Sequence, residues 1–191
     1  MQKTIEQTMR RKTYISFISL FLSAGTAVQL NAQEGYPIPP KTDNLLFYIQ
    51  RSHNKNTIAY ELNFSSDKKL NIEQPVHPYW IRYEEGGARQ ELSYIQRKYA
   101  YGLKFQLIDK QNLFYKIYFV SYSKKYIQLM KSPKDNKIRA YISLNNKFIE
   151  LQKIFIKTDG GTFWFPVVKY IDVSGKESKT GNYLTERIVI N

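Results

Sequence analysis

Hydrophobic and polar residues alternate along much of the chain. In residues 57–64, large apolar side chains occupy every second position from Ile58 to Phe64. Because successive side chains of a strand point to opposite faces, this period indicates a strand with one buried and one solvent-facing side. The apolar run 45–51 precedes it, and the turn-forming residues 52–56 lie between the two. These segments are therefore expected to form a β-hairpin.

Similar strand signals continue to the C-terminus, separated by polar or turn-forming residues. The further candidates are residues 79–83, 103–109, 113–122, 126–130, 137–144, 148–157, 167–173 and 184–190. Asn145 and Asn146 tolerate positive φ and predict a two-residue hairpin turn. Strands joined mainly by short turns predict a mainly β fold, a single antiparallel β-sandwich or barrel of roughly nine or ten strands.

One stretch departs from the strand pattern. Within residues 88–100, Leu92, Ile95 and Tyr99 recur at spacings of three and four, and Gly102 follows. This is the period of an α-helix, so one helix is expected near residues 88–100. Its apolar stripe is expected to pack over one end or face of the sheet.

The N-terminal residues 1–32 have the order of a secretory signal peptide. The basic residues 10–12 precede the apolar run 14–22, and small residues follow up to Ala32. The apolar run is shorter than the roughly 20 residues that a membrane span needs. We expect cleavage after Ala32 or Gln33, a periplasmic or extracellular location, and no transmembrane span in the mature chain.

The rest of the chain is expected to form one domain. Residues 33–43 are rich in proline, which fixes φ and removes a hydrogen-bond donor, and they predict an irregular leader. Neither an internal repeat nor a second linker interrupts the sequence after this leader. Residues 44–191 are therefore predicted to be a single β-rich domain.

Charge and composition limit the classes of function that the protein could have. The chain has 29 Lys and Arg against 16 Asp and Glu, a net charge of +13. Such charge would suit nucleic acid in a cytoplasmic protein, but an exported protein first meets anionic envelope ligands such as lipid headgroups and glycans, so nucleic acid is not the expected partner. The basic residues are scattered without a long run, so an ordinary solvated surface is the other interpretation. The absence of cysteine excludes disulfides and thiol nucleophiles. His53 and His77 lack metal-ligand spacing, so we predict no catalytic residue, no metal and no cofactor.

Basic and aromatic side chains crowd the segment that contains the predicted helix. The candidate ligand-binding residues are Arg51, Trp80, Arg82, Glu91, Arg97 and Tyr101. In a structural interpretation, Glu91 pairs with an arginine and fixes the helix to the sheet above Trp80. In a functional interpretation, arginine forks and aromatic rings converge on an anionic or sugar-like ligand. The sequence leaves both open.

Several of these residues also carry a family resemblance. The run 75–102 resembles the signature of a family of mostly exported bacterial proteins known only as a domain of unknown function, as do 46–52 and the C-terminal segments 170–175, 180–181 and 186–188. The resemblance implies no activity, ligand or cofactor. We therefore predict an exported, non-enzymatic β-domain that binds an envelope ligand or a protein partner. The alternative is an exported, hydrolase-like enzyme with an atypical active site.

Overall fold

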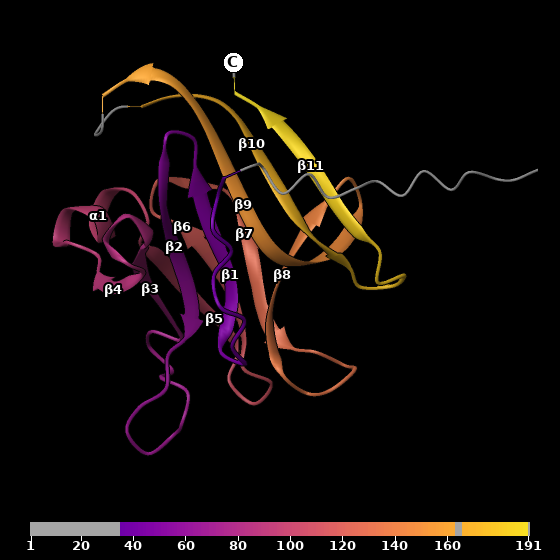
Figure 1. Cartoon of the computed structure of the whole chain (residues 1–191). Coiled ribbons are helices and arrows are strands. Elements are labelled where there is room, and N and C mark those ends of the chain that lie inside the picture. Colours follow the sequence, from indigo (N-terminus) through magenta and orange to yellow (C-terminus); the bar gives the residue numbers. More distant parts are fainter. Residues whose placement is uncertain (1–34, 163–165, 191) are drawn as a thin grey trace, which may run out of the picture. The chain divides into compact units, whose positions relative to one another are not determined.

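The computed structural model describes residues 35–162 and 166–190 (Figure 1). The predicted signal peptide, 1–32, and its cleavage site lie outside the described residues. Within the described ranges, no helix is long and apolar enough to cross a membrane.

The described residues form eleven strands, one short 3-10 helix and one α-helix, which confirms the mainly β prediction. In chain order the elements are β1 (Leu45–Arg51), β2 (Asn54–Leu62), β3 (Val76–Arg82), the 3-10 helix (Tyr83–Glu85), β4 (Ala88–Glu91), α1 (Tyr94–Tyr99), β5 (Leu103–Asp109), β6 (Phe114–Phe119), β7 (Tyr122–Lys131), β8 (Ile138–Leu144), β9 (Lys147–Gly161), β10 (Pro166–Glu177) and β11 (Tyr183–Val189). The predicted Asn145–Asn146 turn is present, with φ of 46° and 62°.

All the strands belong to one sheet, and that sheet is mixed. The order is β4-β3-β2-β1-β9-β8-β7-β6-β5, with β10 between β9 and β11. Strands β1 and β9 run parallel, from Tyr48 opposite Lys153 to Arg51 opposite Ile156. The prediction of a strictly antiparallel sandwich or barrel is therefore wrong. Side-chain alternation reports which face a residue occupies, but not the direction of the neighbouring strand.

The sheet divides along β9. Residues 147–150 of this strand pair with β8, residues 153–156 pair with β1, and the opposite edge of β9 pairs with β10. Two wings, β1–β4 and β5–β8, thus leave the same edge of β9 in succession. They curl toward each other, so that the sheet forms a half-barrel (Figure 1).

The hydrophobic core fills the space between the two wings. Phe47 on β1 stacks on Tyr60 on β2 with ring centroids 4.5 Å apart. Phe119, at the end of β6, meets both rings edge-on at 6.2 and 5.8 Å. Each such buried aromatic side chain contributes roughly 1.5–3 kcal/mol relative to an exposed one, so burial of these faces stabilises the curl.

The α-helix is shorter than predicted. Residues 88–91 pair with β3 as strand β4, and α1 begins only at Tyr94. Ser93 caps the helix through a reciprocal pair of hydrogen bonds with Gln96. Leu92 is buried, as expected, but Ile95 and Tyr99 are 49% and 62% exposed. The predicted apolar stripe therefore faces solvent over most of its length.

The proline-rich segment packs on β1 and β9. The Gln50 side-chain amide donates to the carbonyl of Pro37 at 2.7 Å, and the Tyr36 ring meets Phe155 edge-on at 5.4 Å. Pro39 is buried. Ordered contacts with the sheet thus begin before Asn44.

Candidate functional site

Three of the six predicted site residues come together beneath α1. The guanidinium carbon of Arg51 lies 5.5 Å from the ring centre of Trp80 and 5.4 Å from that of Tyr101. Arg51 is 9% exposed and Trp80 is 3% exposed. Burial raises the pKa of Tyr101, and the charge and hydrogen bond of Arg51 partly oppose this rise. The three side chains form a buried cation–π cluster.

This cluster holds the helix on the sheet. Arg51 is the last residue of β1 and follows the core residue Ile49 by two positions. The Trp80 indole N–H donates to the Gln96 side-chain oxygen at 3.3 Å, which ties β3 to α1. Arg51 and Trp80 thus lie buried at the end of the core beside α1.

The other three predicted residues lie apart from this cluster. Arg82 pairs with Glu85 in the 3-10 helix, and Arg97 is exposed on α1. Glu91 pairs with His77 at 2.9 Å. The pair between Glu91 and an arginine, which the structural interpretation expected, is therefore wrong. Because Glu91 is 56% exposed, this surface pair is worth under about 1 kcal/mol.

The two histidines lie at different places in the fold. His53 is in the β1–β2 turn at φ 63°, and its backbone N–H donates to the Tyr36 hydroxyl. His77 lies on β3 beside Glu91. In the part of the chain that the structure describes, no three His, Asp or Glu side chains are grouped as metal ligands.

A groove that sequence reasoning missed lies where the two wings separate. Its volume is about 480 Å³, and it is bordered by the proline-rich segment, β1, β8, β9, β10 and β11. The polar side chains that line it are Lys41, Thr42, Asp43, Tyr48, Lys137, Arg139, Glu150, Gln152, Lys176 and Tyr183. Four of these are basic and two are acidic, so the groove has an excess of positive charge. We call it the β8–β10 groove.

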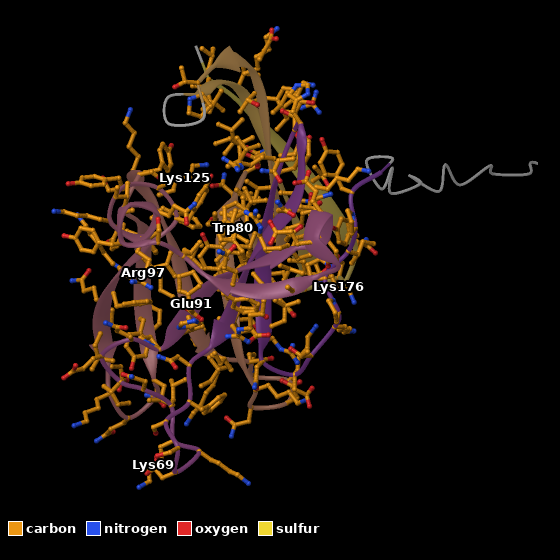
Figure 2. The ribbon with its side chains drawn as sticks, turned by 60° about the vertical axis from the view of Figure 1, so that its left-hand side comes forward. Lys69, Trp80, Glu91, Arg97, Lys125 and Lys176 are labelled. Atoms are coloured by element: carbon orange, nitrogen blue, oxygen red, sulfur yellow. The ribbon has the colours of Figure 1, made fainter. Side chains whose placement is uncertain are left out.

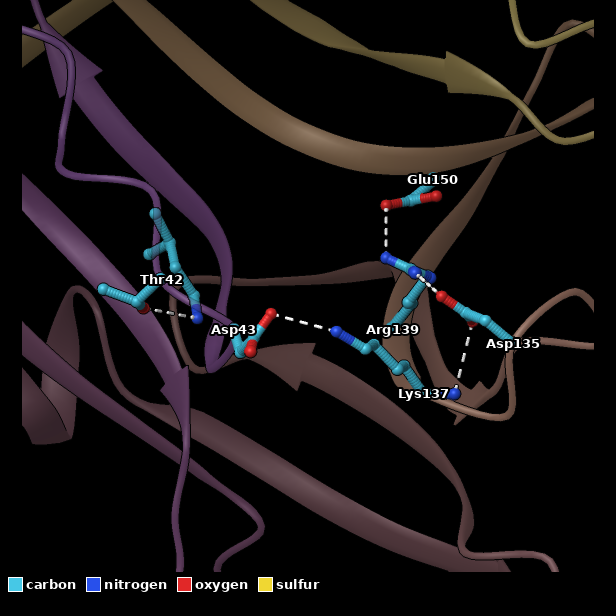
Figure 3. Close-up of polar contacts among 7 residues, drawn as sticks. Thr42, Asp43, Asp135, Lys137, Arg139 and Glu150 are labelled. Carbon is cyan, nitrogen blue, oxygen red and sulfur yellow. Dashed lines mark hydrogen bonds and ion pairs between the residues drawn. The ribbon is translucent and has the colours of Figure 1, made fainter.

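An ion-pair network fixes one wall of the β8–β10 groove (Figure 3). The Lys137 ammonium contacts the Asp43 carboxylate at 3.0 Å. Arg139 contacts Glu150 at 3.2 Å and also pairs with Asp135. Burial opposes the charge of Arg139, but the hydrogen bond to Asp135 and the neighbouring carboxylates raise its pKa overall. The guanidinium is thus held in one orientation at the groove wall.

Two tyrosines line the β8–β10 groove. Burial, together with the neighbouring hydroxyls of Tyr183 and Tyr83, raises the pKa of Tyr48 to about 12. Burial also raises the pKa of Tyr183, and a hydrogen bond with Ser174 partly offsets this. Both phenols are therefore protonated at neutral pH and can donate hydrogen bonds.

Sequence reasoning missed this groove because its walls are far apart in the chain. Tyr48 is on β1 and Tyr183 is on β11, and pairing through β9 and β10 brings these strands together. The available signal was the i, i+2 spacing of Lys137, which directly precedes β8, and Arg139 within it, a spacing that places two side chains on one face of an extended segment. That signal alone does not name the opposite wall.

The fold and the groove define a β-domain with a single short α-helix among its described residues. The model of DUF4833, a domain of unknown function, matches residues 47–187, so the chain belongs to this family. The predicted membership of a domain-of-unknown-function family is thus confirmed. No curated protein and no solved structure matches the chain.

Proposed function

We propose that the protein is an exported, non-enzymatic binding domain that takes a small anionic, sugar-like envelope ligand in the β8–β10 groove. Export to the periplasm or the extracellular space rests on the basic residues 10–12, the apolar run 14–22 and the small residues that follow. The binding site rests on the groove itself. This site replaces the six residues first selected, since Arg51 and Trp80 are buried in the core.

The observation that carries the proposal is the chemistry of the groove lining. Arg139 is held at the wall by two carboxylates, and Lys137 and Lys176 add positive charge nearby. A guanidinium and ammonium groups bind carboxylate or phosphate through charge-assisted hydrogen bonds. The Tyr48 and Tyr183 side chains supply hydroxyl donors and flat rings for a sugar. A ligand that is both acidic and hydroxylated uses all of these groups.

Binding is favoured over turnover by the state of the groove carboxylates. Asp43 is paired with Lys137, and Glu150 is paired with Arg139. Each of these carboxylates is therefore already occupied by a cation of the protein, whereas a general acid or base must face the reacting group directly. Neither His53 nor His77 is among the residues that line the groove.

Calorimetric titration of the full chain with trigalacturonate tests the proposal, with the uncharged galactose trimer as the control ligand. We expect a dissociation constant below about 1 mM for the acidic sugar, a weak but specific affinity. Arg139→Gln should weaken binding by about 10-fold or more, because it removes a charge-assisted contact worth about 1.5–3 kcal/mol.

Lys55→Gln is the matched control variant, because Lys55 is an exposed basic residue near the β1–β2 turn and outside the groove lining. It should change the affinity by less than about twofold, as expected of a distant surface charge. Equal binding of the charged and uncharged trimers, or equal losses in the two variants, would contradict the proposed site.

A further inference from the structure

A second surface combines exposed aromatic and basic side chains at the helix end of the molecule. The Ser121 hydroxyl donates to the Ala100 carbonyl at 2.7 Å, and the Val120 N–H donates to the Gly102 carbonyl at 3.0 Å. These bonds place the β6–β7 turn directly beside the end of α1. In the view of Figure 2, Arg97 of α1 and Lys125 of the hairpin lie on the same side.

Large apolar side chains are exposed on both of these elements. On α1, Tyr94 is 65% exposed, and Ile95 and Tyr99 are the exposed part of the predicted helix stripe. Tyr122 begins β7 and Tyr126 lies four residues further along the strand, and they are 38% and 39% exposed. An exposed apolar group of this kind, rimmed by charge, is typical of a binding surface rather than of ordinary solvent exposure.

Four exposed basic residues accompany these rings, namely Arg97, Lys98, Lys124 and Lys125. Across the two described ranges, none of the four forms an ion pair with an acidic side chain. The sequence explains this, because residues 92–134 contain nine Lys and Arg and a single acid, Asp109. We call these four residues, with the five apolar ones above, the aromatic-basic end.

The helix arranges one lysine between two rings. The Lys98 ammonium lies 5.4 Å from the centre of the Tyr94 ring and 5.2 Å from that of the Tyr99 ring. Hydrogen bonds to these two tyrosines raise the pKa of Lys98, so it is charged at physiological pH. Charge and aromatic surface thus point outward from the same turn of helix.

We infer that the aromatic-basic end docks the protein on the surface of an anionic phospholipid bilayer. Unpaired Lys and Arg side chains are attracted to anionic headgroups. Tyrosine rings prefer the headgroup level of a membrane, where one end is wet and the other apolar. The residues of the aromatic-basic end supply both kinds of side chain.

The exposed aliphatic residue Ile95 favours a bilayer over a hydrated polyanion as the binding partner of this end. Ile95 lies exposed between Tyr94 and the basic pair Arg97–Lys98 in the helix. A bilayer offers the headgroup–acyl boundary in which such a side chain is buried. A nucleic acid strand or an acidic polysaccharide offers phosphates, carboxylates and, at most, ring faces. The composition of this end therefore fits a membrane interface better than a polymer.

Vesicle co-sedimentation of the full chain tests this inference, with phosphatidylcholine vesicles that contain or lack phosphatidylglycerol. The quadruple variant Arg97→Gln, Lys98→Gln, Lys124→Gln, Lys125→Gln should lower partitioning onto the anionic vesicles by about 1,000-fold, since each basic residue near an anionic surface contributes a little under one power of ten. The triple variant Tyr94→Ser, Ile95→Ser, Tyr99→Ser should remove the binding that remains at about 0.5 M salt, where charge attraction is screened. Residues 1–34 are identical in all variants, so any contribution of theirs is common to every measurement.

The matched control removes four other exposed lysines that form no ion pair with the described residues, Lys55, Lys68, Lys110 and Lys179, each by Lys→Gln. It should reduce partitioning by less than about fivefold, the effect of lowering net charge at a distance. Equal losses in the two quadruple variants would overturn the inference, as would failure of the parent chain to prefer anionic vesicles. Tighter binding of single-stranded DNA or heparin than of vesicles at the same end would assign it to a polymer instead.

Discussion

The β8–β10 groove and the aromatic-basic end are both positively charged, but they hold their charge differently. In the groove, Arg139 and Lys137 contact carboxylates at distances of 3.2 and 3.0 Å. At the aromatic-basic end, Lys98 contacts tyrosine rings, and the described residues place no acid within ion-pair distance of it. In Figure 1 the helix lies at the left, and β10 and β11 lie at the right.

The two arrangements of charge suit different kinds of ligand. A cation fixed by carboxylates has a set direction, which favours a small ligand of defined shape. Unpaired cations on flexible stems create a field that suits an extended anionic surface, and salt screens that field strongly. The groove is therefore suited to a small ligand, and the aromatic-basic end is suited to an extended anionic surface.

The largest effect is expected from Gly175→Ala. This substitution tests whether the β8–β10 groove and the aromatic-basic end are independent, because it should damage only the groove. A Cβ at Gly175 would lie 2.0 Å from the Glu150 carbonyl oxygen, so β10 would have to move away from β9. We expect a loss of about 3 kcal/mol or more in the free energy of unfolding, measured by urea denaturation.

Gly160→Ala is the control for Gly175→Ala. A Cβ at Gly160 would meet open space, so the substitution should cost only the strain of a positive φ, about 1 kcal/mol. The folded Gly175 variant should lose acidic-sugar binding and keep vesicle binding. A loss of both activities would show that the two regions are not independent.

Arg51→Ala should have the next largest effect, at the helix end. It removes a buried guanidinium that packs between Trp80 and Tyr101, and we expect a cost of about 2–4 kcal/mol in urea denaturation. Arg97→Ala, on the exposed face of the same region, should cost under about 0.5 kcal/mol. Similar costs for the two arginines would mean that the cluster does not anchor α1.

Arg139→Ala compared with Lys125→Ala tests directly whether paired and unpaired cations differ. Removing Arg139 leaves Glu150 and Asp135 without their cation. Because solvent screens these partly exposed groups, we expect a loss of only about 1–2 kcal/mol in the free energy of unfolding. Lys125→Ala should change stability by less than about 0.5 kcal/mol, because Lys125 is an exposed surface residue. Thermal or urea unfolding of both variants measures the difference, and equal values would show that ion pairing does not distinguish the two cations.

The smallest effect is expected from Tyr48→Phe, and it appears only in alkali. The pKa of Tyr48 is raised from its ordinary value of 10.0 to about 12 in the folded protein. The contribution of the protonated phenol to stability is therefore present below pH 10 and is lost as the pH rises toward 12. Urea midpoints between pH 9 and 11 should fall less steeply in the variant, and an unchanged slope would contradict burial of this hydroxyl in the groove.

Much of the secondary structure followed from local pattern. Strand β1 and strand β5 lie where alternation and flanking turn residues predicted them, at Leu45–Arg51 and Leu103–Asp109. The Asn145–Asn146 turn was equally predictable, because asparagine tolerates positive φ and two residues suffice for a hairpin. Such features depend on neighbours in sequence, so one sequence is enough to find them.

The helix shows where local pattern fails. The 3.6-residue period across residues 88–100 is real, but residues 88–91 pair with β3 and only Tyr94–Tyr99 remain helical. An edge of β3 was available to satisfy those backbone groups, and tertiary pairing prevailed over the weaker helical preference. Ile95 and Tyr99 are exposed in the shortened helix. The spacing of apolar residues predicts that they share one face of a helix, but it does not tell whether that face is buried.

The amino-acid sequence was sufficient to predict the mainly β class, most strand positions and the basic character of the chain, and it named Arg51, Trp80 and Tyr101 among six candidate residues without grouping the three. Only the tertiary structure decided that β1 runs parallel to β9, that Glu91 meets His77, and that Tyr48 and Arg139 border one groove. The physical reason is that period and turn chemistry act within a few residues. Strand partners and groove walls are instead chosen by long-range burial, which a linear pattern does not specify.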